Sequence, residues 1–216
     1  KKEFNYSAIN NFAVREAQGE YLLFLNNDVE IITENWLEEM LQLCQQKDVG
    51  MAGAKLYYPD DTIQHAGVVV GLGGVAAHVL CKLPRDAEGY MGRLRCVQEI
   101  SAVTAACMMV KTSVFKAVGG FDEELKVAFN DIDLCMKVRK YGVKIVFTPY
   151  AELYHYESKS RGMEDTPEKQ LRFSREVNCF RRKWERELLK GDPYYNPNLT
   201  LNNTDCSLRK QEKNGD

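Results

Sequence analysis

The sequence predicts an α/β fold in which helices flank a mixed, mainly parallel sheet. Short apolar runs of strand length alternate along the chain with longer stretches whose apolar residues recur at helical spacing. The run Tyr21–Leu25 is apolar at every position, which is typical of an interior strand covered on both faces. With 216 residues, 44% of them hydrophobic, the chain can bury a sizeable core, which excludes a disordered or fibrous protein.

The predicted helices begin at capping side chains and end at glycines or polar turns. Gly19 is expected just after the first helix, Gly142 after the fourth, and the last helix is expected to run to about Lys190. Pro167 suits the first position of that last helix because proline lacks the N–H that is unpaired there anyway. The residues expected to cap or open the helices are, in chain order, Ser7, Thr33, Ser113, Asn130 or Asp131, and Asp165 or Thr166.

The predicted strands follow these helices in alternation. The glycine-rich stretch 66–80 is too short and too broken for a membrane span, and two strands joined by a turn explain it better. Residues 1–190 are expected to form the folded domain, and residues 191–216 a polar tail. The expected strands are 21–25, 49–56, 65–70, 103–110 and 143–147, the last one closed by Thr148 and Pro149.

Charge and cysteine content exclude some classes of protein. Lysine and arginine (29) nearly balance aspartate and glutamate (31), so bulk charge does not indicate a nucleic-acid or anionic-lipid partner. The seven cysteines are an odd number without a C-x-x-C pair, which favours reduced thiols and a cytoplasmic protein over a secreted one.

The first candidate for chemistry is Asn26-Asn27-Asp28, directly after the buried run. Ligands of open α/β sheets bind beyond the carboxyl ends of the strands. One carboxylate and two amides are hard oxygen ligands suited to Mg²⁺ or Mn²⁺, and they also hold sugar hydroxyls. A plain turn is the alternative interpretation, and for these residues taken alone it is the favoured one.

The second candidate is Asp131, near the start of a predicted helix. The helix dipole and unpaired backbone N–H groups keep such a carboxylate ionised, so it can accept a proton as a general base. Helix capping is the alternative interpretation. Asp133 lies two residues further, so the two carboxylates do not face each other and are not a glycosidase pair.

The third candidate is His155, followed by Ser158 and Arg161. Imidazole is a common ligand of divalent metals, and serine and arginine are natural contacts of a diphosphate. A structural histidine after a strand is the alternative interpretation.

Together these segments resemble family-2 glycosyltransferases. Phe24–Asp28 is similar to the DXD-like metal motif of that family, and Val118–Glu123 with Phe129–Cys135 to its acceptor loop and base motif. The run 149–162 is similar to the histidine region that closes the family's active site. The tail 192–199 resembles bacterial members linked to rhamnan and O-antigen synthesis. The resemblance covers nearly the whole chain and implies a GT-A fold, so that the sheet belongs to a nucleotide-diphospho-sugar transferase.

The resemblance also implies roles for single residues. Asp28 and His155 would hold a divalent metal, Mn²⁺ or Mg²⁺, and Asp131 would be the general base. The donor would be bound by Asn26, Asn27, Ser158 and Arg161. Two departures stand out: Asn130 occupies a place where the family usually has an acid, and the DXD-like motif lacks its first acid, so Asp28 is its one charged ligand.

The implied reaction is a metal-dependent, inverting transfer of a hexosyl or rhamnosyl group. The donor would be a nucleoside-diphosphate sugar, and the acceptor a cell-surface polysaccharide or a lipid-linked saccharide. One base must take the acceptor proton, and positive charge must meet the negative charge that grows on the diphosphate. No covalent enzyme nucleophile is needed. The expected location is the cytoplasm, at the inner face of the membrane.

The resemblance further predicts that this sequence is truncated. Nothing in it matches the strands that build the nucleoside pocket in the family, so we expect the fragment to be inactive or weakly active. An unpaired sheet edge at that point predicts a homodimer or swapped assembly. The donor sugar, the acceptor and the linkage are not visible in the sequence.

Two other classes of function stay open at this stage. A non-catalytic module that binds a glycan or a protein would share the fold, as would a nucleotidyltransferase, although no glycine-rich triphosphate loop is present. The basic-aromatic stretch Phe180–Trp184 fits a peripheral membrane contact, but a solvated helix face with a buried tryptophan is the favoured interpretation.

Overall fold

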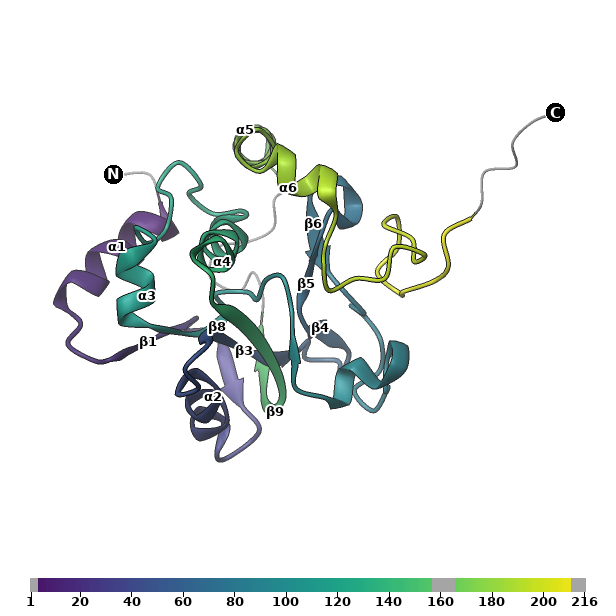
Figure 1. Cartoon of the computed structure of the whole chain (residues 1–216), viewed down its shortest axis with the longest axis horizontal. Helices are drawn as coiled ribbons and strands as arrows, with labels where there is room; N and C mark the ends of the chain where they lie inside the picture. Colours follow the sequence, from purple (N-terminus) through teal and green to yellow (C-terminus); the bar gives the residue numbers. More distant parts are fainter. Residues whose placement is uncertain (1–3, 157–165, 211–216) are drawn as a thin grey trace.

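The computed structural model describes residues 4–156 and 166–210 as a mixed α/β fold (Figure 1). Two short 3-10 helices, η1 (Leu72–Gly74) and η2 (Tyr90–Arg95), lie in the long excursion between β5 and β7. The α-helices are α1 (Tyr6–Glu16), α2 (Trp36–Cys44), α3 (Thr112–Ala117), α4 (Asn130–Tyr141), α5 (Pro167–Lys183) and α6 (Glu185–Lys190). The strands are β1 (Tyr21–Leu25), β2 (Val29–Ile31), β3 (Val49–Tyr57), β4 (Ile63–His65), β5 (Val68–Val70), β6 (Ala76–His78), β7 (Gln98–Glu99), β8 (Cys107–Lys111) and β9 (Lys144–His155).

The α/β class is confirmed, but the strands of the described residues are not mainly parallel. The main sheet has the order β1-β8-β3-β9-β2, with β4 beside β3 and β7 beside β9. Within it β3 and β9 pair in parallel, and the other pairings between described strands are antiparallel. The strand β1 lies at one end of this order, and the homodimer expected at its outer edge stays a prediction.

Helices cover both faces of the sheet, as Figure 1 shows. One buried cluster packs α2 against β3 and β9 through Met40, Leu56 and Leu153. The other lies under α1, α3, α4 and α5 and includes Phe24, Phe147 and Phe180. The run Tyr21–Leu25 is a strand, as predicted, but it is not an interior one: β1 lies at the end of the sheet order, and Leu25 is 40% exposed.

Several helix ends differ from the expected ones because tertiary contacts decide them. Asn5 caps α1 by accepting a hydrogen bond from the Ala8 N–H, while Ser7 is buried inside the helix and donates to the Leu125 carbonyl. The helix ends at Glu16, so Gly19 lies beyond its cap. The expected cap Thr166 with Pro167 is confirmed.

The other caps were predicted less well. Asn35, not Thr33, occupies the N-cap position of α2, and Thr33 instead accepts a hydrogen bond from the Glu152 N–H. Phe129, not Asn130 or Asp131, precedes α4. The expected last helix is two helices, because the helical backbone breaks at Trp184.

Three expected strands also change. Gly67, at φ 103°, separates β4 from β5, so residues 65–70 are not one strand. Residues 103–106 form a loop before β8. The strand β9 runs through Pro149 to His155, with an irregular register against β3 that accommodates the proline, which cannot donate a ladder hydrogen bond.

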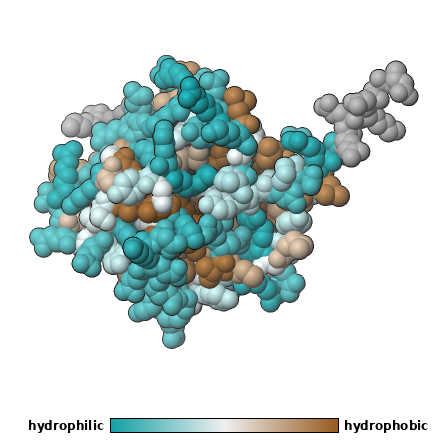
Figure 2. All heavy atoms as spheres, viewed as in Figure 1, coloured by the Kyte–Doolittle hydropathy of each residue, from teal (hydrophilic) through white to brown (hydrophobic). Residues whose placement is uncertain are grey.

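The segment expected as a polar tail packs against the β5–β6 hairpin as far as it is described. Tyr195, Leu199 and Cys206 are buried, and the Asp192 carboxylate accepts a hydrogen bond from the Val70 N–H. No helix among residues 4–156 and 166–210 is long and apolar enough to cross a membrane. The surface in the view of Figure 2 is mainly hydrophilic, with scattered hydrophobic side chains.

Candidate functional site

The structure brings Asp28, Asn26 and His155 together at the carboxyl end of β1. The short strand β2 pairs with the end of β9 so that Val29 lies opposite His155, which places the preceding residue, Asp28, beside the imidazole. Asp28 Oδ1 lies 3.3 Å from His155 Nε2, and Asn26 Nδ2 lies 3.1 Å from the same nitrogen. Residues 129 positions apart thus meet around one ring nitrogen.

A buried glutamine fixes the orientation of this ring. Gln64, 4% exposed on β4, places Oε1 2.7 Å from His155 Nδ1, and its Nε2 donates to the His155 carbonyl at 3.2 Å. An amide oxygen only accepts, so His155 Nδ1–H is the donor of this hydrogen bond. When the ring is neutral, the lone pair of Nε2 therefore faces Asn26 and Asp28, which is the arrangement that a metal-binding histidine needs.

These residues fit a divalent metal through their donor atoms. Two ligands at right angles around an octahedral ion, each about 2.1 Å away, lie about 3 Å apart, close to the 3.3 Å between Asp28 Oδ1 and His155 Nε2. No group of three His, Cys, Asp or Glu side chains in the described part of the chain could hold a metal. A metal here would therefore take its further ligands from water and a substrate phosphate, as Mg²⁺ commonly does.

Asp131 lies in the first turn of α4. Its Oδ1 accepts a hydrogen bond from the Ile132 N–H at 2.8 Å, and its Oδ2 accepts one from the Ala105 N–H at 3.1 Å. Two backbone N–H donors, one of them in the first turn of the helix, thus hold the two carboxylate oxygens in place. Burial, and then the charge of Asp131, raise the pKa of the neighbouring Tyr6 phenol, so that it stays protonated.

One short loop joins the candidate base to the candidate metal pair. The Ala105 N–H holds the Asp131 carboxylate, while the carbonyl of the next residue, Ala106, accepts a hydrogen bond from the Asn26 N–H at 3.0 Å. Two consecutive residues before β8 therefore fix the separation between the carboxylate of α4 and the polar end of β1.

The loop before α4 is held in a strained form by α5. Phe129 has φ 62° and ψ 4°, a left-handed conformation that costs a residue with a side chain roughly 1–3 kcal/mol. Its ring packs on Phe173 and Phe180, with centroids 5.7 and 5.5 Å away. The buried Glu176 carboxylate accepts hydrogen bonds from the N–H groups of Val127 and Ala128.

Not every predicted site residue joins this cluster. Asn27 is exposed and makes no hydrogen bond to the described residues, while Ser158 and Arg161 lie outside them. Asp133 is fully buried and turned to Trp184, whose Nε1 donates to it at 2.8 Å, so it does not face Asp131, as its spacing indicated.

Sequence reasoning missed Gln64 and a histidine pair. His65 Nδ1 lies 3.0 Å from His78 Nδ1, and the Thr104 N–H donates to His65 Nε2 at 3.4 Å. Burial, and then the charges of His78 and His155, lower the pKa of His65 well below its ordinary value. The polar pair Gln64-His65 between Ile63 and the apolar run 66–70 was the available signal.

Sequence comparison identifies similar chains. A family model described as "Glycosyltransferase like family" matches residues 1–176. A protein of Sinorhizobium fredii named "Uncharacterized protein y4gI" is 56% identical over 208 residues, which are 96% of this chain and 23% of that protein. "O-antigen biosynthesis protein RfbC" of Myxococcus xanthus is 42% identical over 214 residues, 99% of this chain and 16% of that protein. The chain thus spans less than a quarter of the length of these relatives.

Solved structures show the same fold at low sequence identity. The mannosyltransferase PcManGT from Pyrobaculum calidifontis, in complex with GDP-Man and Mn²⁺, matches with a TM-score of 0.55 and 15% identity, over 86% of this chain and 45% of that one. GalNAc-T7, with UDP, GalNAc and Mn²⁺, matches with a TM-score of 0.61 and 13% identity, over 88% of this chain and 36% of that one. The fold is therefore that of GT-A glycosyltransferases.

Proposed function

Because the chain belongs to the glycosyltransferase-like family, with a family-2 type of domain, we propose that it moves a sugar from a nucleoside-diphosphate donor to a saccharide acceptor. The observation that supports this most is the loop 105–106, which ties the Asp131 carboxylate to the end of β1 where Asn26, Asp28 and His155 meet. A base on one side and a metal pair on the other are the two groups that such a transfer needs.

In the proposed reaction Asp131 accepts the proton of the acceptor hydroxyl. The acceptor oxygen then forms a bond to the anomeric carbon as the bond from that carbon to the diphosphate oxygen breaks, and the nucleoside diphosphate leaves with the electron pair. Attack opposite the leaving group inverts the anomeric centre. The N–H groups of Ala105 and Ile132 hold the carboxylate in position for this role.

The residues Asp28 and His155 would hold the divalent metal, Mn²⁺ or Mg²⁺, with Asn26 beside them. When bound, such an ion would supply positive charge against the diphosphate and help to orient it. Asn27, Ser158 and Arg161 remain proposed donor contacts. The GDP-Man and Mn²⁺ held by the solved mannosyltransferase are ligands of the types that we assign here.

The acceptor that we propose is a surface polysaccharide or its lipid-linked precursor, with hexosyl or rhamnosyl transfer. Its support is the O-antigen biosynthesis protein among the relatives. All seven cysteines are free thiols, which suits a reducing compartment, so we place the reaction in the cytoplasm at the inner face of the membrane.

A transfer assay in the longest natural protein that contains this sequence tests the proposal. A panel of nucleoside-diphosphate sugars with Mn²⁺ is offered to the wild type, to Asp131→Asn and, as matched control, to Asp205→Asn, whose carboxylate is exposed and, among the described residues, accepts hydrogen bonds from Ser207 in its own turn. We expect product from the wild type and the control, and a loss of roughly 100-fold or more in Asp131→Asn. Equal activity in all three would reject the base assignment, and no activity across the panel would favour the non-catalytic binding module.

A further inference from the structure

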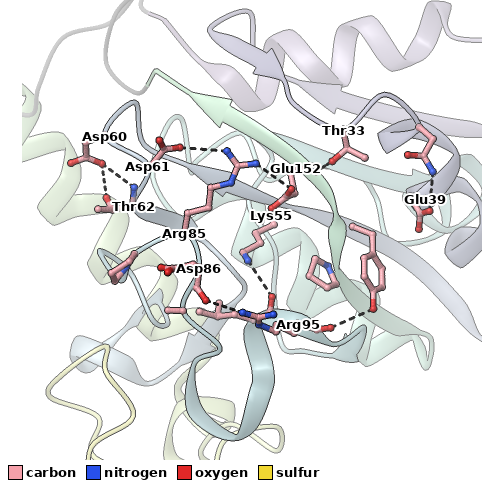
Figure 3. Close-up of a pocket in the computed structure, with 16 residues that line it drawn as sticks. Thr33, Glu39, Lys55, Asp60, Asp61, Thr62, Arg85, Asp86, Arg95 and Glu152 are labelled. Carbon is pink, nitrogen blue, oxygen red and sulfur yellow. Dashed lines mark hydrogen bonds and ion pairs between the residues drawn. The ribbon is translucent and has the colours of Figure 1, made fainter.

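A polar cavity of about 1110 Å³ opens beside β9 (Figure 3). Its walls come from the start of α2, the turn after β3, the loop before η2 and the edge of β9. Neither Asp28, His155 nor Asp131 lines it. Along β9 the Glu152 side chain lines the cavity, and Tyr154 bonds to the lining residues Asp61 and Arg85.

Strand alternation separates this cavity from the candidate metal pair. Lys55, Leu56 and Tyr57 lie opposite Glu152, Leu153 and Tyr154 in regular register, so side chains alternate between the two faces here. Glu152 and Tyr154 take one face of β9, and Leu153 and His155 take the other. The cavity is thus a separate feature, and its binding does not depend on the proposed transfer reaction.

A buried lysine with spare donors points into this cavity. Lys55 is 4% exposed, and Figure 3 shows its side chain between Arg85 and Arg95. Its ammonium group has three N–H donors, and the hydrogen bond found for it among the described residues goes to the Leu94 carbonyl at 3.1 Å. Burial lowers its pKa, because the charged form is poorly solvated there. Acceptor oxygens of a ligand would satisfy the remaining donors.

The charges of the walls indicate what kind of ligand fits. Three cations and five carboxylates surround the space, and they are Lys55, Arg85, Arg95, Glu39, Asp60, Asp61, Asp86 and Glu152. Five carboxylates repel a phosphate or another strong anion, and the polar walls offer little to an apolar molecule. A neutral ligand rich in hydroxyl groups suits walls that carry charges of both signs, because a hydroxyl can donate to a carboxylate and accept from a cation.

The size of the cavity and one exposed ring at its rim limit the class of ligand further. The volume exceeds the roughly 300–1,000 Å³ of pockets that bury drug-sized molecules, so it has room for more than one sugar ring. Tyr150 at the rim is 53% exposed and offers a flat apolar face whose hydroxyl bonds to the Arg95 carbonyl at 3.4 Å. We propose that this cavity binds a segment of a neutral oligosaccharide, with Lys55 and Arg85 as hydrogen-bond donors and Tyr150 as the stacking surface.

Titration of this chain by two-dimensional ¹H–¹⁵N NMR tests the proposal. Three neutral oligosaccharides serve as probes, an α-linked rhamnose trisaccharide, mannotriose and maltotriose, with inorganic phosphate as the anionic comparison. At millimolar concentration we expect at least one trisaccharide to shift the amides of Thr62, Ala87, Arg95 and Tyr150, and phosphate to leave them unchanged.

Two variants and one matched control make the test specific. Tyr150→Ala is expected to weaken binding about five- to tenfold, by loss of the stacking surface. Lys55→Met keeps the apolar stem of the side chain and is expected to weaken oligosaccharide binding by a similar factor. The control Tyr141→Ala removes a ring that is 57% exposed on α4, away from the cavity. If Lys55→Met does not fold, Tyr150→Ala decides alone, because its ring is exposed.

Three results would overturn the proposal. They are the absence of shifts at these amides with every trisaccharide, shifts by phosphate in their place, and equal affinity of the wild type, Tyr150→Ala and Tyr141→Ala. Shifts confined to Asn26, Asp28 and His155 would place sugar binding at the other site and would also reject this one.

Discussion

Replacing Gln64 with leucine is expected to release the imidazole of His155 from its fixed orientation. The wild-type amide accepts from His155 Nδ1–H at 2.7 Å and donates to the His155 carbonyl at 3.2 Å, in a site where Gln64 is 4% exposed. Leucine has a similar size but no polar atoms. The variant leaves a buried ring N–H without this acceptor, which costs about 1–3 kcal/mol in the free energy of unfolding.

The larger consequence concerns the metal. A ring without its Nδ1–H acceptor exchanges to the Nε2–H tautomer, which has no lone pair to offer at Nε2. Loss of an outer partner of this kind typically lowers metal affinity about 10- to 100-fold. We therefore expect Gln64→Leu to weaken Mn²⁺ binding by that factor, as measured by the EPR signal of free Mn²⁺ in a titration.

Two further variants separate this effect from general disturbance. Gln64→Glu keeps an acceptor oxygen for Nδ1–H and is expected to bind Mn²⁺ at least as tightly as the wild type. Gln42→Leu, on the exposed side of α2, makes the same chemical change away from the site and should alter nothing. Long-range ¹H–¹⁵N spectra of histidine report the tautomer directly, with His155→Ala assigning the signals. An unchanged Nδ1–H tautomer together with unchanged Mn²⁺ affinity in Gln64→Leu would refute this reasoning.

Three other predictions concern the frame around the site. Glu176→Ala should speed amide hydrogen exchange at Val127 several-fold, since its carboxylate holds that N–H, and equal exchange rates would contradict this. Asp133→Asn should lower the free energy of unfolding by about 3 kcal/mol in urea, because it removes the charge of a fully buried carboxylate that pairs with the half-buried Lys137 and Lys183, and a change within error would argue against that role. A hydrogen bond from Lys144 lowers the pKa of Asp48, so Lys144→Met should be slightly less stable at neutral pH. The stability deficit of Lys144→Met should vanish as the pH falls below about 4 and through the lowered pKa of Asp48, because the protonated Asp48 carboxyl gains nothing from Lys144. A deficit that does not change with pH would refute this prediction.

Local signals in the sequence were enough for much of the fold. The apolar run Tyr21–Leu25, followed by the polar residues 26–28, predicts a strand with a polar end, and the structure has both, although only Leu22 and Phe24 of this end strand are buried. The pair Thr166-Pro167 likewise predicts a helix start, because the Thr166 hydroxyl accepts from the nearby Lys169 N–H and the proline ring fixes its own backbone angle.

Features that depend on distant partners were not visible. The strand β9 continues past Pro149 because β2 and β3 supply partners on either side, and no local pattern shows this. Ser7 is favourable as a cap, yet it serves the Leu125 carbonyl 118 residues away. Whether a polar residue caps or bridges depends on the tertiary contact that it finds.

The candidate site also has residues that the sequence could predict and residues whose role only distant contacts reveal. Asp28, Asp131 and His155 stand out through residue type and position, but the loop 105–106 that joins them is apolar and gives no signal in the sequence. Gln64 lies 91 residues from the ring that it orients, so that only the folded chain shows its role.

The most direct test of the central claim is pulsed EPR of Mn²⁺ bound to this chain. The protein has three histidines, so a ¹⁴N coupling of imidazole type must come from His65, His78 or His155. The geometry predicts that this coupling is present in the wild type and in His78→Ala, is lost in His155→Ala, and that Asp28→Asn binds Mn²⁺ much more weakly. A coupling that persists in His155→Ala, or Mn²⁺ affinity equal in the wild type and Asp28→Asn, would contradict the metal site on which the proposed transfer rests.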